Sequence, residues 1–280
     1  MTSAAADSRE RRLWVDGSEH RWLERGNGLP VILVHGIPTS PELWRHVLPL
    51  VGGARLLAWE MPGYGRSWQV EADLDISVGA QADHLLAWMS ELDVERAVLV
   101  GHDLGGGVVQ IAAARAPQRC GGIVLTNAIS YDSWPIPEVK AMRAAGAVVE
   151  RLPRALLRAQ LGLLIRMGHD NSDRVRESLD VHWPAYDHPA GAKSLVRQMR
   201  SLDSRDTQAV ASALPTLNVP AAVVWGSADR FQKLDPYGRR LTSALGASLD
   251  EINTGKHFTP EDHPDRVAAA INRIVADVRP

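Results

Sequence analysis

The sequence has very little cysteine, no long apolar run and no surplus of charge of one sign. Cys120 is its single cysteine, so no disulfide can form within the chain, and nothing argues for an oxidising compartment. No apolar stretch approaches the roughly 20 residues that a membrane-spanning helix needs. The first thirty residues also lack the continuous apolar core of a signal peptide. We therefore expect a cytoplasmic protein that does not act in a membrane.

The charge distribution argues against a nucleic-acid partner. The formal net charge is -2 at pH 7, and the basic residues, nearly all arginine, are spread along the 280-residue chain. Nucleic-acid binding usually needs a basic stripe or patch. We expect instead a small, largely apolar organic substrate, with no metal and no other cofactor. The sequence leaves open whether the chain is a monomer or a homodimer.

Short apolar runs alternate with helical patterns along much of the chain. After a hairpin predicted around Asp16-Gly17, wholly apolar runs typical of buried parallel strands lie at 31–34, 54–59, 97–100, 122–126 and 221–225. Stretches with helical periodicity lie between the earlier runs, at 41–51, 78–92 and 104–114. This alternation predicts an open, mostly parallel sheet with helices on both faces.

The alternation stops between about Ser130 and Leu217. Five helical segments are predicted there, at 137–152, 153–167, 172–182, 190–202 and 206–214, with no strand among them. A helical excursion inside a parallel-sheet protein indicates an insertion over one edge of the sheet. We predict a core formed by residues 1–130 and 218–280, and a helical cap formed by residues 131–217.

A sharp turn between a strand and a helix carries the first candidate catalytic residue. Gly101-His102-Asp103-Leu104-Gly105 follows an apolar run and precedes a helical pattern, the context in which Gly-x-nucleophile-x-Gly works. Asp103 is already ionised at pH 7 and can attack a saturated carbon to form an alkyl-enzyme ester. Strained epoxides and carbon–halogen bonds are natural targets for this chemistry. The simpler alternative is an aspartate that only caps the helix.

A candidate acid and a candidate histidine base follow this turn later in the chain. Asp229 comes just after the run at 221–225, at the carboxyl edge of the sheet, and can fix the tautomer of a histidine ring. His257 precedes the amphipathic helix predicted at 264–275, and we assign it as the base that activates water for ester hydrolysis. Asp132, after the run at 122–126, is the alternative orienting acid.

These motifs resemble the haloalkane dehalogenase and epoxide hydrolase branch of the α/β-hydrolases. The resemblance covers roughly residues 29–132 and 217–278, and it includes His35-Gly36-Ile37-Pro38 and Pro62-Gly63-Tyr64-Gly65-Arg66-Ser67. It implies the α/β-hydrolase fold and a triad of Asp103, His257 and Asp229. It also implies an oxyanion hole made by the backbone N–H groups of Ile37 and Leu104.

The chain departs from the family pattern where the leaving group is held. Haloalkane dehalogenases usually carry tryptophan after the nucleophile and asparagine after the His-Gly pair, whereas this chain has Leu104 and Ile37. Epoxide hydrolases instead use cap tyrosines that donate to the ring oxygen. The candidates for such donors are Tyr186, Tyr131, Trp134 and Trp183.

We predict epoxide hydrolysis to a vicinal diol. In this reaction Asp103 attacks a ring carbon, the two tyrosines protonate the oxygen, and His257 drives water onto the ester. The alternative is hydrolytic dehalogenation, with Trp134 or Trp183 as halide donors. Two further hypotheses are lactone or ester hydrolysis with Asp103 as general base, and a non-catalytic ligand-binding protein on the same scaffold.

Overall fold

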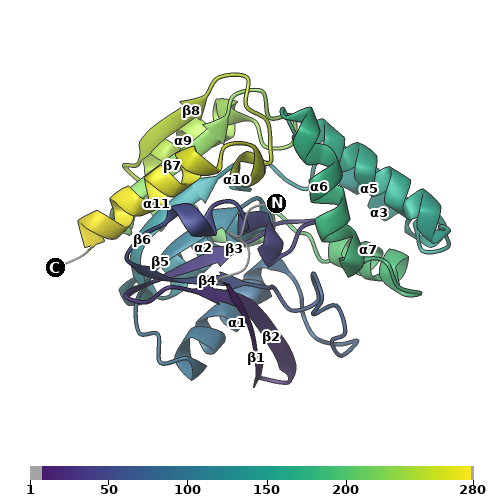
Figure 1. The fold of residues 1–280 in the computed structure, drawn as a ribbon, viewed down its shortest axis with the longest axis horizontal. Coiled ribbons are helices and arrows are strands. Elements are labelled where there is room, and N and C mark those ends of the chain that lie inside the picture. Colours follow the sequence, from purple (N-terminus) through teal and green to yellow (C-terminus); the bar gives the residue numbers. More distant parts are fainter. Residues whose placement is uncertain (1–7, 279–280) are drawn as a thin grey trace.

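The computed structural model describes residues 8–278 and has an eight-stranded sheet at its centre (Figure 1). The strands are β1 (Arg9–Val15), β2 (Ser18–Arg25), β3 (Leu29–Val34), β4 (Ala54–Trp59), β5 (Ala97–His102), β6 (Cys120–Thr126), β7 (Ala221–Gly226) and β8 (Ser248–Ile252). Their order in the sheet is β1-β2-β4-β3-β5-β6-β7-β8. Strand β2 pairs antiparallel with β1 and β4, and the other neighbours are parallel. The predicted mostly parallel sheet is confirmed.

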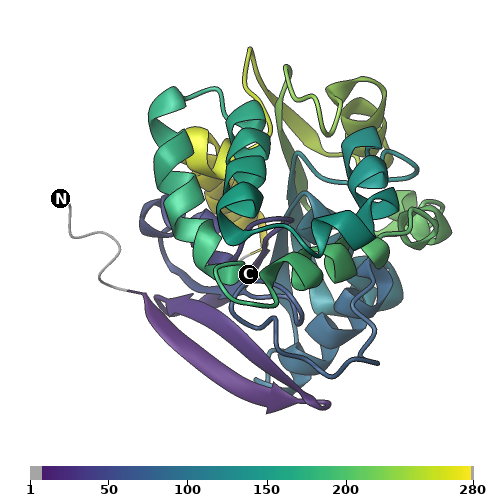
Figure 2. The same cartoon turned by 90° about the vertical axis from the view of Figure 1, so that its right-hand side faces the viewer.

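Helices cover both faces of this sheet (Figures 1 and 2). On β3, Ile32 and Val34 pack with α1 (Val78–Glu91) and α2 (Leu104–Arg115), whereas Val31 and Leu33 pack with α11 (Pro264–Val278). Successive side chains of a strand point to opposite faces, so a strand covered on both sides must be apolar throughout. This burial explains the continuous apolar runs of the sequence.

The chain between β6 and β7 contains helices and connecting turns. The helices are α3 (Pro137–Ala144), α4 (Gly146–Val149), α5 (Arg154–Gly168), α6 (Ser172–His182), α7 (Gly191–Arg200) and α8 (Arg205–Val210), with short turns η5 (Trp183–Ala185) and η6 (Leu214–Thr216). We call residues 137–216 the inserted helices. Figure 1 shows α3, α5, α6 and α7 gathered at one end of the sheet. The division into core and cap at residues 131 and 217 stays a prediction.

Two of the predicted helices differ in the structure. The segment predicted at 41–51 forms two short 3-10 turns, η2 (Pro41–Trp44) and η3 (Leu48–Leu50), each with a proline near its start. The helix predicted at 137–152 is broken at Ala145, where the chain comes close to α7. A side chain at Gly146 would lie 2.8 Å from the Arg200 guanidinium. A glycine at this position therefore allows the close approach of α7.

The C-terminal part of the core holds elements that the sequence patterns did not predict. These are η7 (Leu234–Gly238), α9 (Arg239–Ala244), α10 (Thr259–Asp262) and strand β8. A further short turn that was not predicted, η4 (Pro117–Arg119), lies before β6. Strand β8 is an edge strand with mostly polar and partly exposed residues, so it lacks an apolar run.

Within residues 8–278, no helix combines the length and the apolar character that crossing a bilayer requires.

Candidate active site

Asp103 occupies the tip of the sharp turn between β5 and α2. Its backbone has φ 50° and ψ -119°, a conformation that is strained for a residue other than glycine. The turn closes only because its neighbours are small: a Cβ atom at Gly101 would lie 2.4 Å from the Gly105 carbonyl oxygen. Only 6% of Asp103 is exposed, and its side chain lines a cavity.

The loop after β3 holds one oxygen of this carboxylate. The Ile37 N–H donates to Asp103 Oδ2 at 3.1 Å. The Leu104 N–H, at the start of α2, also stabilises the ionised carboxylate. Gly36 leaves room for this contact, since a Cβ atom there would lie 2.5 Å from Oδ2. The structure thus brings both predicted oxyanion amides to Asp103.

His257 lies between the predicted nucleophile Asp103 and the predicted acid Asp229. Its Nδ1 is 2.9 Å from Asp229 Oδ2, and its Nε2 is 4.0 Å from Asp103 Oδ1. A carboxylate can only accept, so Nδ1 carries the proton of this hydrogen bond, and Nε2 of the neutral ring is left as the basic nitrogen. The separation of 4.0 Å exceeds a hydrogen bond. The base therefore faces the nucleophile without bonding to it.

The loop after β6 supports the acid through a residue that the sequence analysis missed. Asn127 Nδ2 donates to Asp229 Oδ2 at 2.6 Å, and the Phe231 N–H donates to Asp229 Oδ1 at 2.8 Å. Asp132, the alternative acid, is exposed and makes no hydrogen bond to His257 among the described residues. The chain has already turned towards the surface there, so the position next to Asp229 belongs to Asn127. An asparagine directly after a buried strand was the signal available.

Burial and neighbouring charges shift the pKa values of Asp103 and His257. Burial raises the pKa of Asp103, and the charge of His257 and the N–H groups of Ile37 and Leu104 only partly oppose the rise. Burial alone would lower the pKa of His257. The charge and hydrogen bond of Asp229, and then the charge of Asp103, outweigh burial, so that this pKa is raised.

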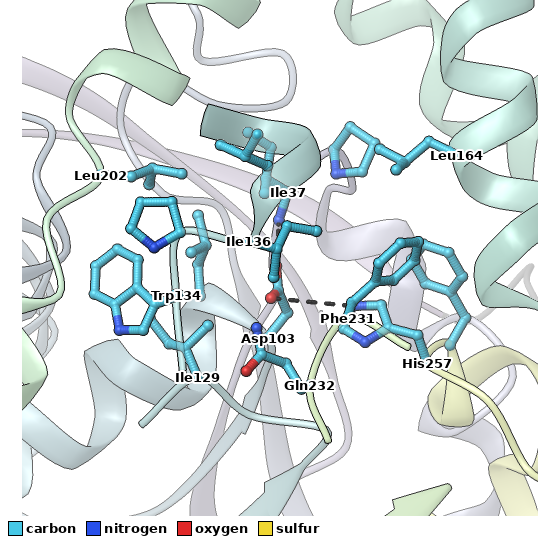
Figure 3. A pocket seen from close by; sticks show the side chains of 15 residues that line it. Ile37, Asp103, Ile129, Trp134, Ile136, Leu164, Leu202, Phe231, Gln232 and His257 are labelled. Atoms are coloured by element: carbon cyan, nitrogen blue, oxygen red, sulfur yellow. Dashed lines mark hydrogen bonds and ion pairs between the residues drawn. The ribbon is translucent and has the colours of Figure 1, made fainter. Parts of the chain in front are cut away.

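The cavity around Asp103 is strongly apolar. Figure 3 shows Asp103 and His257 facing one another, with aliphatic and aromatic side chains around them, among them Ile37, Ile129, Ile136, Leu164, Leu202 and Phe231. Leu164 comes from α5, whereas Phe231 and His257 come from the core loops after β7 and β8. The cavity is therefore closed jointly by the core and the inserted helices.

Most of the predicted leaving-group donors lie elsewhere. Tyr186 is buried among the inserted helices and donates its hydroxyl to Gln198 at 2.9 Å. The ring of Tyr131 packs against the Arg240 guanidinium, 3.8 Å from its centroid. Neither tyrosine lines the cavity, and neither does the half-buried Trp183.

Trp134 is the one predicted donor whose ring lines the cavity. Its Nε1 donates to Thr207 Oγ1 at 2.8 Å, so its N–H is already occupied. The structure consequently leaves the predicted epoxide-opening donors without access to the carboxylate. The reason is packing, because Tyr186 is buried among the inserted helices, whereas Tyr131 and Trp134 are buried in the core cluster.

The comparisons with known proteins agree with this architecture. A model of the alpha/beta hydrolase fold family matches residues 30–264. Haloalkane dehalogenase 2 of Mycobacterium tuberculosis (strain ATCC 25618 / H37Rv) is 28% identical over 271 residues, which is 92% of each protein. An alpha/beta hydrolase fold protein from Burkholderia ambifaria superposes with a TM-score of 0.85 at 26% identity, over 93% of this chain and 96% of that one. The epoxide hydrolase CorEH superposes with a TM-score of 0.76 at 19% identity, over 98% of this chain and 100% of that one. The chain therefore belongs to the α/β-hydrolase fold family and is a hydrolase, with haloalkane dehalogenases among its relatives.

Proposed function

We propose that the chain hydrolyses a carbon–halogen bond of a small, largely apolar substrate through an alkyl ester on Asp103. One observation carries the proposal. Asp103 Oδ2 is held by the Ile37 N–H, while Oδ1 faces His257 at 4.0 Å and the carboxylate lines the apolar cavity. A carboxylate with one oxygen anchored and the other desolvated is suited to in-line attack on saturated carbon.

The reaction proceeds in two displacements. In the first, Asp103 Oδ1 attacks the carbon, the carbon–halogen bond breaks and halide leaves. In the second, His257 Nε2 takes a proton from water, and the hydroxide attacks Cγ of the ester. The negative charge develops on Oδ2, next to the N–H groups of Ile37 and Leu104. The bond between Cγ and Oδ1 then breaks, and the alcohol leaves with the proton from His257. Asp229 orients the ring throughout.

The lack of a hydroxyl or ammonium donor among the described residues that line the cavity ranks dehalogenation before epoxide opening. A departing halide needs no proton, whereas the alkoxide formed from an epoxide must take one up. Among the described residues that line the cavity, no tyrosine, serine, threonine or lysine is present. The sequence-based preference for epoxides depended on Tyr186 and Tyr131, and both hydroxyls are outside the cavity.

Epoxide hydrolysis is the second candidate, because one acid does remain. The raised pKa of His257 favours the protonated ring, which can act as an acid. That proton could pass to an alkoxide formed within the cavity. In this route the product is a vicinal diol, and no halide is released.

The proposed function is tested by trapping the alkyl ester on Asp103. His257→Gln removes the base, so the chain should stall after the first displacement and gain the mass of the substrate's alkyl group. We would incubate this variant with bromoalkanes, chloroalkanes and epoxides, and read the intact-protein mass. A halide substrate leaves an adduct without halogen. An epoxide that needs the proton of His257 leaves no adduct in this variant, and it is recognised with the wild-type chain by release of a diol without halide. The double variant Asp103→Asn/His257→Gln should gain nothing, and Asp132→Asn/His257→Gln should behave like His257→Gln.

Absence of an adduct from every haloalkane would contradict the covalent route to dehalogenation. Turnover by the wild-type chain in water carrying a heavy oxygen isotope then distinguishes a nucleophilic Asp103 from an Asp103 that acts as a general base. A nucleophilic Asp103 takes the label into its own carboxylate, whereas an aspartate that acts as general base on an ester or lactone does not.

A further inference from the structure

Gln232 is an uncharged polar residue in the wall of an otherwise apolar cavity. It lines the same cavity as Asp103 and His257, and only 2% of it is exposed. Its Oε1 is buried without a hydrogen-bond partner among residues 8–278, and the hydrogen bonds of this part of the chain do not involve its side-chain amide. A buried, unpaired amide costs roughly 1–3 kcal/mol. A packing role alone therefore does not explain this residue type.

The main chain of Gln232 is held rigidly next to the catalytic acid. The Trp225 Nε1–H donates to the Gln232 carbonyl oxygen at 2.9 Å, and the adjacent Phe231 N–H donates to Asp229 at 2.8 Å. Figure 3 shows the Gln232 amide turned towards Asp103, with its nitrogen on the side of that carboxylate. The loop that positions the acid thus also directs an N–H donor at the reacting centre.

Other N–H groups around the cavity are already engaged. The Ile37 N–H bonds Asp103, and the Trp134 indole N–H bonds Thr207. Leu104 has an apolar side chain at the position after the nucleophile. Among the described cavity residues, the Gln232 amide is the side-chain donor that is neither bonded elsewhere nor required as the base.

We propose that Gln232 binds the departing halide, its Nε2–H donating to the halogen as the carbon–halogen bond breaks. This inference rests on the proposed dehalogenation and adds to it a leaving-group site built from the loop after β7. Charge grows on the halogen in the transition state. A donor fixed there in an apolar cavity lowers the barrier of the first displacement and leaves hydrolysis of the ester unchanged.

The test measures the rate of ester formation in the His257→Gln background. Gln232→Met keeps the length of the side chain and removes the amide. We expect adduct formation to slow about 100-fold with a chloroalkane, and by a smaller factor with the matching bromoalkane, because bromide departs more easily. Product inhibition by added bromide should weaken as well. Gln208→Met, a change at an exposed glutamine, should leave both rates unchanged.

The outcomes separate this inference from the proposed function. Equal slowing for chloride and bromide, or no slowing, would overturn the role of Gln232 while the adduct still supports the ester. No adduct in the His257→Gln background itself would instead count against dehalogenation as a whole. If Gln232→Met does not fold, Gln232→Glu keeps the shape and should weaken bromide inhibition by repelling the anion; unchanged inhibition in that variant would reject the inference.

Discussion

Asp103 and His257 control each other's charge across 4.0 Å. In the free protein the ionised Asp103 helps to keep the pKa of His257 raised, which favours the imidazolium. In the proposed reaction, ester formation neutralises Asp103 and removes that contribution. The pKa of His257 should then fall, so the ring becomes a base at the step that needs one. Under this proposal the same pair of residues changes role between the two displacements.

This coupling predicts a pKa change that can be measured in a single substitution. Asp103→Asn is neutral and similar in shape, so it mimics the charge state of the ester. We expect the pKa of His257 to fall in this variant, because the charge of Asp103 contributes to raising it. Titration of the His257 ring by nuclear magnetic resonance measures both proteins. An unchanged pKa would mean that Asp103 has no electrostatic influence on the base.

A second prediction at the scale of one residue concerns Asn127. Its Nδ2 donates to Asp229 at 2.6 Å, and its φ of 43° suits asparagine or aspartate. Asn127→Asp keeps the backbone preference but places a second carboxylate against the acid, so that one of the two must protonate. We expect hydrolysis of the preformed ester to slow by roughly 10- to 100-fold, measured by stopped-flow. Asn218→Asp is the matched control, because Asn218 is exposed and has φ 45°.

At the scale of elements, the site is assembled from the ends of five neighbouring strands. The loops after β3, β5, β6, β7 and β8 supply Ile37, Asp103, Asn127, Asp229 and His257. These strands run parallel, so their carboxyl ends share one edge of the sheet, where ligands bind in open α/β folds. The inserted helices lie over this edge and complete the cavity.

The close packing of the β3 and β5 loops makes Gly36 a sensitive position. Gly36→Ala would place a Cβ atom 2.5 Å from Asp103 Oδ2, so the carboxylate must move out of its position. We expect ester formation in the His257→Gln background to slow by about 100-fold, with the fold retained by circular dichroism. Gly52→Ala is the control, since nothing lies within 4 Å of its added carbon. Equal rates in both variants would show that the geometry at Gly36 is not limiting.

At the scale of the whole molecule, a buried polar cluster joins the inserted helices to the core. Glu261 is fully buried and accepts from Arg45 and from Ser178, the latter at 2.6 Å. His169, at the end of α5, bonds Asp262 at 2.7 Å. The N–H of His257 donates to the Gly168 carbonyl at 2.9 Å, so the loop of the base is attached to α5 itself. The position of His257 is thus linked to the position of the inserted helices.

The charge of His169 predicts how stability depends on pH. Burial opposes its charged form, but the hydrogen bonds and charges of Asp262 and Glu261 outweigh burial and raise its pKa to about 9. A raised folded-state pKa means that the stabilisation is complete below pH 6.5 and is lost as the pH rises through about 9. We expect the free energy of unfolding to fall by on the order of 2 kcal/mol over this range.

Urea unfolding at pH 6.5 and pH 9 measures this fall. His169→Gln should abolish most of it, because the titrating ring is gone, although the variant itself will be less stable at pH 6.5. His84→Gln, outside the cluster, should retain the full dependence. The same fall in His169→Gln as in the wild-type chain would assign the dependence to other groups.

The sequence alone predicted the mostly parallel sheet and the helical stretch between β6 and β7. It also predicted five site residues, which are Ile37, Asp103, Leu104, Asp229 and His257. Apolar runs, a Gly-rich turn and residue order are local signals, since they depend on backbone sterics and on strand burial. Only the tertiary structure decided what lines the cavity. Tyr186 and Trp134 carry the right chemistry, but their polar atoms bond to Gln198 and Thr207 within the packed interior. Asn127 and Gln232 have no motif, and they gain their roles only because folding brings distant loops together around buried, unpaired or charged groups.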